Sequence, residues 1–395
     1  MSYLEQKIKQ YRYLNEFQCL ADKCPDHCCY GWSVHIDHNT HHLYRNKAPE
    51  LLDYVEKRNN SYFVKKDLDT EQCIKMVKGL CSVQLEYGKE YMGNTCLLYP
   101  RIRYNIKGNM MIAASLSCPE ITRLCLFTNN PFKIDIGQLD GIIEKNDIAR
   151  YGGCNTKKIL YINQKFIKFC QNKNASAEQI LLKIIIIADK LDQLSKKKWT
   201  YVIPKLLRLP IKYRYEPIYD KNLPFNLIEI ASIMLHSSKK IKHRRIYNIL
   251  DNIEKILKIK IDKDSDKIIP SKNSIKIYQS LIDIWRNNLN INNVLKKYMQ
   301  SYMAMELFPY GKPHITLYDQ IIIFTYKFLF IKLALITSLK ADSIESDQDQ
   351  NNTVVNIIQG VSKYLDHTKN THVILKKFDE HQYHNIFLLE GILLA

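Results

Sequence analysis

The sequence predicts a mainly α-helical protein in which a small, mixed α/β, cysteine-rich metal-binding domain precedes a larger helical domain. Eight of the eleven cysteines lie before residue 120, and four of these fall between Cys19 and Cys29. From about residue 155 onward, apolar residues recur at three- and four-residue spacings, which is the period of an amphipathic helix. The predicted domains are therefore residues 1–128, built around the thiols, and residues 129–395.

The first half of the small domain is predicted to contain short elements. Residues 1–18 favour a short helix or an extended lead-in. Residues 32–37 alternate apolar and polar side chains and favour a strand. Asp37 or Thr40 is then expected to cap a helix that runs through His41 and Tyr44, because both residue types accept hydrogen bonds from the first helical turn. Residues 50–58 are predicted to form another helix.

The second half of this domain, residues 73–126, is rich in turn-forming residues. A short helix is predicted between Gln84 and Gly93, where glycine ends it. The turn sequence Lys107-Gly108-Asn109 predicts a hairpin between strands at residues 101–106 and 110–116.

Helices are predicted throughout the second domain, at residues 158–170, 175–194, 225–236, 245–257, 275–289 and 321–337, with two closing helices around 353–365 and 382–394. A flexible basic and polar segment is expected near residues 237–275, where Ile261–Lys267 is rich in Lys, Asp and Ser. Residues 342–352 are acidic and predict a loop.

Residues 321–337 form the most apolar stretch of the chain. A membrane-spanning helix needs about 20 largely uncharged residues, whereas this stretch is shorter and contains Lys327 and Lys332. We therefore expect a central buried helix and no membrane span. Residues 1–9 lack the apolar segment of a signal peptide, so we expect a cytoplasmic protein with reduced thiols.

The net charge of +18 raises the question of nucleic-acid binding. Residues 1–130 contain 17 Lys+Arg and 14 Asp+Glu, which leaves 41 basic and 26 acidic residues in the remainder. That remainder is also rich in Ile, Asn and Tyr, a bias typical of nucleotide composition acting on codons. No helix-turn-helix, RNA-recognition or zinc-finger spacing is present. We therefore interpret the charge as solvated helix faces and expect no nucleic-acid partner.

The clustered thiols indicate a metal centre, since thiolates are soft ligands for zinc and iron. Structural zinc sites use paired Cys-x2-Cys units, but the spacing here is Cys19-x4-Cys24-x3-Cys28-Cys29. Adjacent Cys28 and Cys29 also interrupt the Cys-x3-Cys-x2-Cys pattern of radical enzymes. An iron–sulfur cluster tolerates irregular spacing and takes four cysteines. The candidate ligands are Cys19, Cys24, Cys28, Cys29, Cys73, Cys81, Cys96 and Cys118, of which those that do not bind metal would support the site.

Two short segments carry candidate catalytic side chains. Residues 95–101 place Tyr99 and Arg101 on either side of a proline, and residues 117–120 place Glu120 two positions after a thiol. Arg101 could bind a carboxylate, while Tyr99 or Glu120 could orient an amine. The alternative interpretation is that Arg101 and Glu120 form an ion pair that braces the cysteine-rich domain.

These motifs together resemble the flagellin lysine-N-methylase family. The resemblance rests on Cys19…Cys24…Cys28-Cys29…Gly31-Trp32, Leu80-Cys81-x-x-Gln84, Thr95-Cys96-x-x-Tyr99-Pro100-Arg101 and Leu116-Ser117-Cys118-Pro119-Glu120, with weaker similarity at Glu306–Tyr310 and Tyr364–His367. The first part is also similar to cysteine-rich zinc- or iron-chelating domains. The specific motifs lie in the first 126 residues.

The resemblance implies methyl transfer from S-adenosylmethionine to lysine ε-amines of flagellin. It also implies an iron–sulfur cluster of the 4Fe-4S type. A lysine amine must be neutral to attack a methyl sulfonium, so Tyr99 and Glu120 are the candidates for accepting its proton. The alternative function is a non-catalytic metal-binding interaction module that holds zinc or iron, with the helical part docking a partner.

Overall fold

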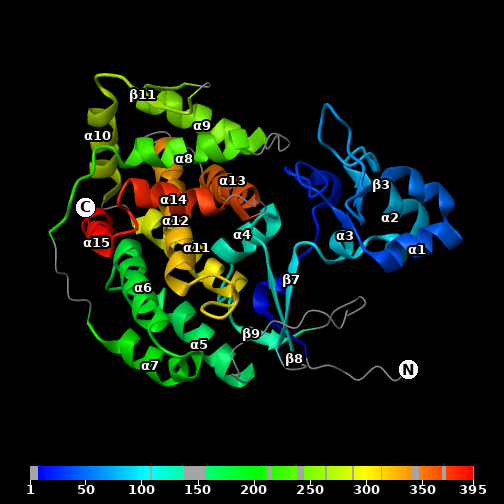
Figure 1. The fold of residues 1–395 in the computed structure, drawn as a ribbon, viewed down its shortest axis with the longest axis horizontal. Coiled ribbons are helices and arrows are strands. Elements are labelled where there is room, and N and C mark those ends of the chain that lie inside the picture. The colour runs from blue at the N-terminus through cyan, green and yellow to red at the C-terminus, as the bar shows by residue number, and fades with distance from the viewer. Residues whose placement is uncertain are drawn as a thin grey trace.

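The computed structural model describes residues 8–106, 109–137, 156–210, 216–237, 244–262, 265–286, 289–312, 314–339, 347–366 and 371–394. It confirms the predicted mainly α class. Figure 1 shows a large body of helices next to a smaller lobe that contains α1, α2, α3 and β3. The buried apolar residues form two separate clusters, one in each part.

Short elements build the small lobe. In chain order they are β2 (His35–Ile36), α1 (His38–Lys47), a 3₁₀ helix (Pro49–Tyr54), β3 (Val55–Arg58), β4 (Ser61–Val64), β5 (Met76–Val77), β6 (Leu80–Cys81), α2 (Ser82–Tyr87) and α3 (Asn94–Leu98). Strands β2, β4 and β3 form an antiparallel sheet in that order, and β5 pairs with β6. Their apolar sides enclose a small core that includes Ile36, Tyr44, Leu51 and Tyr54.

The predicted helix at residues 50–58 is wrong in its second half. The chain forms a 3₁₀ helix over Pro49–Tyr54 and then turns into strand β3. The reason is the hairpin turn at Asn59 and Asn60, which both adopt positive φ, at 44° and 62°. Two consecutive left-handed residues are typical of the tight turns that join antiparallel strands, and Asn tolerates this conformation.

A four-stranded sheet lies beside the helices of the body, with its strands in the order β7-β8-β1-β9 (Figure 1). Strands β7 (Arg101–Ile106) and β8 (Asn109–Ala114) form the predicted antiparallel pair, and Lys107 and Gly108 of the expected turn lie outside the described residues. Strand β1 (Ile8–Tyr11) runs parallel to β8 and antiparallel to β9 (Ile134–Ile136). Residues 8–11 are therefore the extended lead-in that was one of the two expectations for the N-terminal segment.

Helices make up most of the body. They are α4 (Pro119–Phe127), α5 (Thr156–Phe169), α6 (Ala177–Asp192), α7 (Lys196–Arg208), α8 (Leu223–Ser237), α9 (Arg244–Leu257), α10 (Ser274–Arg286), α11 (Leu289–Met305), α12 (Leu317–Ser338), α13 (Asp347–Asp366), α14 (Thr371–Glu380) and α15 (Ile386–Leu394). The predicted helices at 158–170, 175–194, 225–236, 245–257, 275–289 and 321–337 all form, with small shifts at their ends. The spacing of apolar residues in the sequence thus located most of the helices of the body.

Helices α4, α7, α11 and α14 of the body were not predicted. Helix α7 contains Pro204, which normally argues against a helix interior because it lacks an N–H group. Helix α4 begins with Pro119 at its first position, where the missing N–H costs nothing. Helix α11 begins with several asparagines, which interrupt the three- and four-residue spacing of its apolar side chains. In α7, burial against neighbouring helices outweighs the unfavourable proline, and in α11 it outweighs the polar residues at the start of the helix.

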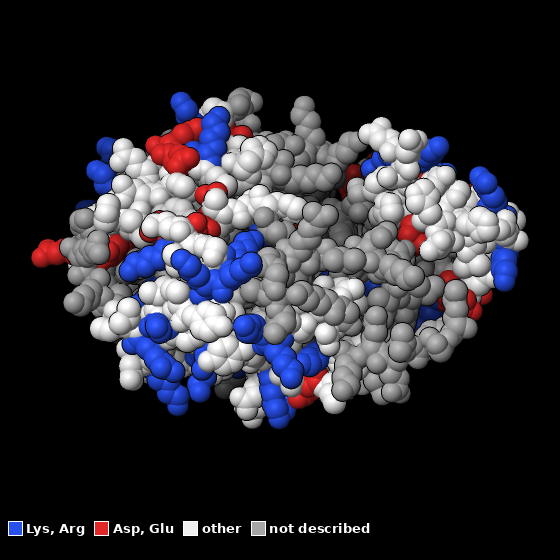
Figure 2. Space-filling view, turned by 60° about the horizontal axis from the view of Figure 1, so that its bottom comes forward, with Lys and Arg blue, Asp and Glu red and all other residues white. Residues whose placement is uncertain are grey.

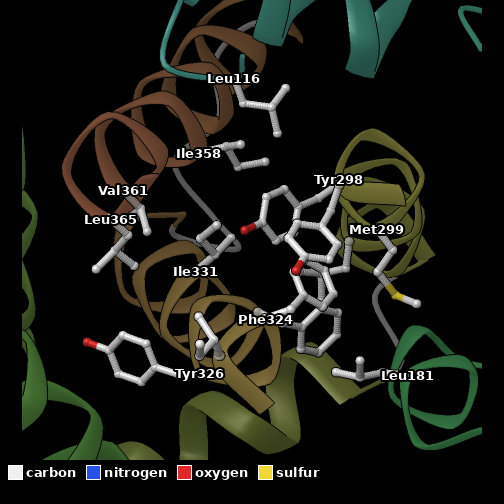
Figure 3. Close-up of a cluster of buried hydrophobic side chains, with 14 of the residues drawn as sticks. Leu116, Leu181, Tyr298, Met299, Phe324, Tyr326, Ile331, Ile358, Val361 and Leu365 are labelled. Carbon is white, nitrogen blue, oxygen red and sulfur yellow. The ribbon is translucent and has the colours of Figure 1, made fainter. Parts of the chain in front are cut away.

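Helix α12 is the centre of the body. Its length and hydropathy would suit a membrane span, but 89% of its most apolar window is buried inside the protein. It packs against α6, α8, α9, α13 and α14, as expected for a central helix. Figure 3 shows Phe324 and Ile331 of α12 pointing toward Tyr298 of α11 and Ile358 of α13. The Phe324 and Tyr302 rings stack with their centroids 4.0 Å apart.

Three segments differ in detail from the sequence-based expectations. The described part of the segment 237–275 contains α9 and a hairpin of β10 (Ile259–Ile261) and β11 (Ile268–Pro270). Helix α13 begins at Asp347, inside the acidic loop expected at 342–352, and ends near the predicted position. The last predicted helix, 382–394, is preceded by α14, and α15 starts only at Ile386.

The large core also includes residues from the predicted first domain. Tyr11 of β1, Ile112 of β8 and Ile121 of α4 are fully buried within it. The small core contains none of these residues, and its last buried member is Val83. We therefore propose that the small unit ends near residue 100 rather than at residue 128, and that the four-stranded sheet, including β1 at residues 8–11, belongs to the helical body.

Asp37 caps α1 and also holds the start of α3. Its carboxylate accepts hydrogen bonds from the Thr40 N–H (2.9 Å), the Thr40 hydroxyl (2.7 Å) and the Asn94 N–H (3.0 Å). Burial alone would raise the pKa of this carboxyl, but these hydrogen bonds outweigh burial and lower the pKa. Of the two cap candidates, Asp37 is thus the one used.

We expect Asp37→Ala to destabilise the protein by about 1–2 kcal/mol at pH 7, the usual cost of removing a helix cap. Asp37→Asn keeps a side-chain oxygen and should cost less. Because the folded pKa of Asp37 is depressed, its contribution is complete above about pH 4. It is lost as the pH falls through the folded pKa. Urea denaturation at neutral and acidic pH measures both effects, and equal stability of wild type and Asp37→Ala at pH 7 would contradict the cap.

Candidate functional site

Five of the eight predicted metal-ligand cysteines gather in the small lobe, and we refer to Cys28, Cys29, Cys73, Cys81 and Cys96 as the thiol cluster. The Cys28 and Cys29 sulfurs lie 3.9 Å apart. The Cys73 N–H donates to the Cys29 carbonyl (2.8 Å), and the Trp32 indole N–H donates to the Cys28 carbonyl. Cys81 ends β6, and Cys96 lies on α3. All five are half-buried free thiols.

The thiols in this cluster influence each other electrostatically. Burial and the neighbouring Cys28, Cys73 and Cys81 raise the pKa of Cys96. The pKa of Cys28 is instead lowered to about 7, because the Cys29 thiol donates a hydrogen bond to it and because Lys363 places a positive charge nearby. Cys28 therefore ionises more readily than Cys29, Cys73 and Cys96, whose pKa values are raised, and thiolates are the form that binds metal.

The other three predicted ligands lie apart from this cluster. Cys19 is exposed, whereas Cys118 is buried at the start of α4 in the large core. Burial raises the pKa of Cys118 to about 12, with small additional effects from Cys24 and Cys19. Burial raises the pKa of Cys24, and Cys28 and Cys19 add smaller effects in the same direction, so Cys24 lies near both of these thiols. Which of the eight thiols bind metal stays a prediction.

The donor set of the thiol cluster is of the type that soft metals bind. It consists of sulfur atoms that are partly shielded from water and carry no disulfide in the described part of the chain. Across the described residues, no three His, Cys, Asp or Glu side chains converge as the ligands of a single ion do. A cluster of several iron atoms differs from a single ion in this respect, because each thiolate binds a different iron.

The candidate catalytic residue Tyr99 lies where the small lobe meets the body. A cis peptide bond joins it to Pro100. Its hydroxyl lies 3.0 Å from the Ser117 hydroxyl, and its ring centroid lies 5.3 Å from that of Trp32. Burial and the nearby Cys118 raise the pKa of Tyr99 well above its usual value. The phenol is thus protonated at neutral pH and suited to donating a hydrogen bond.

The other two candidates have partners of their own. The Arg101 guanidinium lies 5.3 Å from the centre of the Phe17 ring. Glu120, on α4, accepts two hydrogen bonds from Arg123, at 2.8 and 2.7 Å. One of the two interpretations of the sequence was an ion pair between Arg101 and Glu120, but the bidentate partner of Glu120 is Arg123, one helical turn away.

A buried polar network, which sequence reasoning missed, joins the cysteine-rich loop to α13. Asp26 accepts from Lys363 Nζ at 2.6 Å and from Gln359 Nε2 at 2.7 Å. Gln359 also donates to the Ser117 carbonyl (2.8 Å) and accepts from Arg245 (2.6 Å). The side chains of Lys363 and Asp26 are only 4% and 13% exposed. We call Asp26, Arg245, Gln359 and Lys363 the interlobe network.

Lys363 also holds the loop directly. Its ammonium group donates to the His27 carbonyl (3.0 Å) and lies 5.7 Å from the centre of the Tyr30 ring. His27 immediately precedes Cys28, so this hydrogen bond from α13 helps to hold the loop that carries the thiol. More than 330 residues separate Asp26 from its two partners on α13. No local motif could have revealed contacts of that separation.

A second buried set of charges lies where α11, α12 and α13 come together. Lys327 of the central helix pairs with Asp366 at the end of α13, and Glu306 pairs with Lys312 at 2.9 Å. Both carboxylates belong to the segments of weaker family similarity. The side chain of Lys327 is only 4% exposed. Burying a charge requires a partner of this kind, which explains the lysine in the most apolar stretch.

We expect Lys363→Met to destabilise the protein by about 3–5 kcal/mol, because it leaves the Asp26 carboxylate buried without its partner. The double variant Lys363→Met/Asp26→Asn should recover part of this loss, since neither charge then remains. The control is Lys376→Met, because Lys376 is exposed and its ion pair with Glu380 spans 3.9 Å. That pair should contribute less than about 1 kcal/mol. Urea denaturation measures all three variants; a cost for Lys363→Met no greater than for the control would contradict a buried pair.

Comparison with known proteins provides the family. A family model described as "FliB lysine N-methylase C-terminal domain" matches residues 163–389. The flagellar biosynthetic protein FliU of Salmonella muenchen is 27% identical over 149 residues, which are 35% of this chain and 87% of that protein. Lysine-N-methylases of Salmonella typhimurium and Salmonella choleraesuis are each 24% identical over 188 residues, or 45% of this chain and 46% of theirs.

The alignments thus span about half the length of these lysine-N-methylases. No solved structure matches the chain. The family match covers the helical body with Gln359 and Lys363, whereas the motifs that first suggested the resemblance lie mostly before residue 126. Because the matched residues 163–389 make up more than half of the chain, this protein belongs to the FliB lysine N-methylase family.

Proposed function

We propose that this protein is an S-adenosylmethionine-dependent protein-lysine N-methyltransferase that acts on flagellin. The family match over residues 163–389 carries the proposal. The names of the relatives, lysine-N-methylase and flagellar biosynthetic protein, support the reaction and the flagellar substrate. The free thiols in the described part of the chain agree with a cytoplasmic location, where thiols stay reduced.

We also propose that four cysteines, drawn from the thiol cluster and its neighbours, hold a 4Fe-4S cluster. The support is the concentration of half-buried sulfur donors from the loop at residues 28–29, the β5–β6 hairpin and α3. A bound cluster would supply a redox-active centre and would link these short elements covalently. The low pKa of Cys28 would favour its thiolate as one of the ligands.

The candidate catalytic residues suggest distinct roles near the substrate amine. A lysine ammonium has a pKa near 10.4 and must lose its proton before it can attack a methyl group. Tyr99 is protonated, so we propose that it orients the amine with a hydrogen bond rather than removing the proton. Glu120 would accept the proton, and Arg101 would bind a substrate carboxylate. Tyr99 contacts Ser117, which precedes Glu120 by three residues, and Arg101 follows Tyr99 by two residues.

A methylation assay tests the activity. Purified protein incubated with S-adenosylmethionine and flagellin should add methyl groups to flagellin lysines, as detected by mass spectrometry of flagellin peptides. Tyr99→Phe, which removes only the hydroxyl, should lower kcat by about 10- to 100-fold while the protein remains folded. An unmodified flagellin after incubation with intact, metal-loaded protein would eliminate this substrate.

Iron analysis tests the cluster separately from activity. Protein purified without oxygen should be brown and contain iron and acid-labile sulfide. Cys28→Ser and Cys96→Ser should lose most of that iron, since serine is a poor ligand for it. Cys170→Ser is the matched control, because Cys170 is buried in the large core away from the thiol cluster. A colourless protein that contains zinc would favour the alternative, a metal-binding interaction module.

A further inference from the structure

Helices α5 to α7 carry a concentration of positive charge that the function described above does not use. Residues 156–208 contain 12 Lys+Arg and 3 Asp+Glu, a balance of +9, which is half of the +18 of the whole chain. Two of the three carboxylates already have hydrogen-bonding partners outside these helices. Glu178 pairs with Lys332 at 2.7 Å, and Asp192 accepts from the backbone N–H groups of Leu317 and Tyr318. A uniform compositional bias would spread the charge more evenly.

The charges form two stripes on neighbouring helices. Lys158, Lys165 and Lys168 on α5 are spaced so that they share one side of the helix, and Lys205 and Arg208 do so on α7. The helices pack together, with Lys158 Nζ 5.5 Å from the centre of the Tyr201 ring. We call these five side chains the basic face. Figure 2 shows Lys and Arg gathered on the lower left of the molecule, where α5 and α7 lie in Figure 1.

A surface pocket opens between the two stripes. Its cationic lining is Lys165, Lys168 and Arg208, and its apolar lining is Phe169, Pro204 and Leu207. None of these three cations forms an ion pair with a carboxylate anywhere in the described residues. No carboxylate lines the pocket either. The pocket therefore offers positive charge around an apolar floor, which suits a partner with acidic groups next to an apolar side chain.

We propose that the basic face docks an acidic segment of the protein substrate. From Lys158 to Lys168 the stripe is about 15 Å long at 1.5 Å per helical residue. An extended peptide of about five residues spans the same length. Such a peptide could place carboxylates on the basic face and an apolar side chain in the pocket. The identity of the substrate as flagellin rests on the proposed function.

The aromatic residues here favour a peptide over a nucleic acid. Single-stranded nucleic acids stack their bases on open aromatic faces. The exposed rings on these helices, Tyr161 and Tyr201, each already have a lysine ammonium group against the ring, with Lys165 Nζ 5.0 Å from the Tyr161 ring centre and Lys158 Nζ 5.5 Å from that of Tyr201. A membrane-binding helix would also need a continuous apolar face to insert among the lipids. Lysines interrupt any such face here.

Docking at this surface would act on substrate capture rather than on the chemical step. Figure 1 shows α7 at the end of the body away from the small lobe that carries the thiol cluster. Contacts made equally with the bound substrate and the transition state lower KM and leave kcat unchanged. Attraction between opposite charges is also screened by salt. Both properties distinguish docking from a catalytic role.

The test is the triple variant Lys165→Glu/Lys168→Glu/Arg208→Glu in the full-length protein. Its dissociation constants for fluorescently labelled flagellin and for a peptide with five consecutive glutamates should rise at least about tenfold. KM for flagellin should rise similarly at unchanged kcat. The matched control, Lys255→Glu/Lys272→Glu/Lys276→Glu, makes the same change in net charge at exposed lysines of another region. It should leave binding within about twofold of wild type.

Circular dichroism establishes that both triple variants fold, and a glutamine triple at positions 165, 168 and 208 provides a milder second variant with the same direction of effect. Unchanged flagellin and peptide binding in the folded variants overturns the proposal. Tighter wild-type binding to single-stranded oligonucleotide or to phosphatidylglycerol vesicles than to the glutamate peptide overturns the choice of partner. If flagellin binds through the basic face but gains no methyl group, the docking surface stands and the proposed activity fails.

Discussion

The ion pair between Lys363 and Asp26 is the interaction on which the relation between the two parts of the molecule depends. Neither charge could remain in so enclosed a position without the other, since removing an ion from water costs several kcal/mol. Asp26 also accepts a hydrogen bond from Gln359, and Lys363 also donates one to the His27 carbonyl. The loop that begins the thiol cluster is thereby attached to α13, near the opposite end of the chain.

The attachment of the thiol-bearing loop to α13 means that the small lobe and the helical body are connected. The thiols come from short elements with a small core of their own, and such elements contribute little stability by themselves. The family match instead lies in the helical body, which supplies Gln359 and Lys363. Tyr99 and Ser117, from the two motifs that first indicated the family, contact each other where the parts meet. The cysteine-rich lobe and the body are therefore joined by contacts between the very motifs that first indicated the family and by the interlobe network.

The positive charge of the chain also divides between two roles. Buried lysines, such as Lys327 in the central helix and Lys363 in α13, have carboxylate partners and hold the interior together. The lysines of α5 and α7 lie on the surface, where few carboxylates are near. Composition alone suggested that all of them were solvated helix faces, and it could not separate these groups, because net charge carries no information about which residues are neighbours.

The periodicity of apolar residues determined the mainly α class and the positions of most helices. Each helix buries one side, and this produces a pattern among residues that are close in sequence. The β7–β8 hairpin and the Asp37 cap were equally local. The parallel pairing of β1 with β8, the helix across Pro204 and the interlobe network were decided only by the tertiary structure. Each joins residues distant in sequence or overrides a local preference through burial. The cysteine spacing indicated a metal centre, but only the packing of the loop, hairpin and α3 shows which five thiols come together.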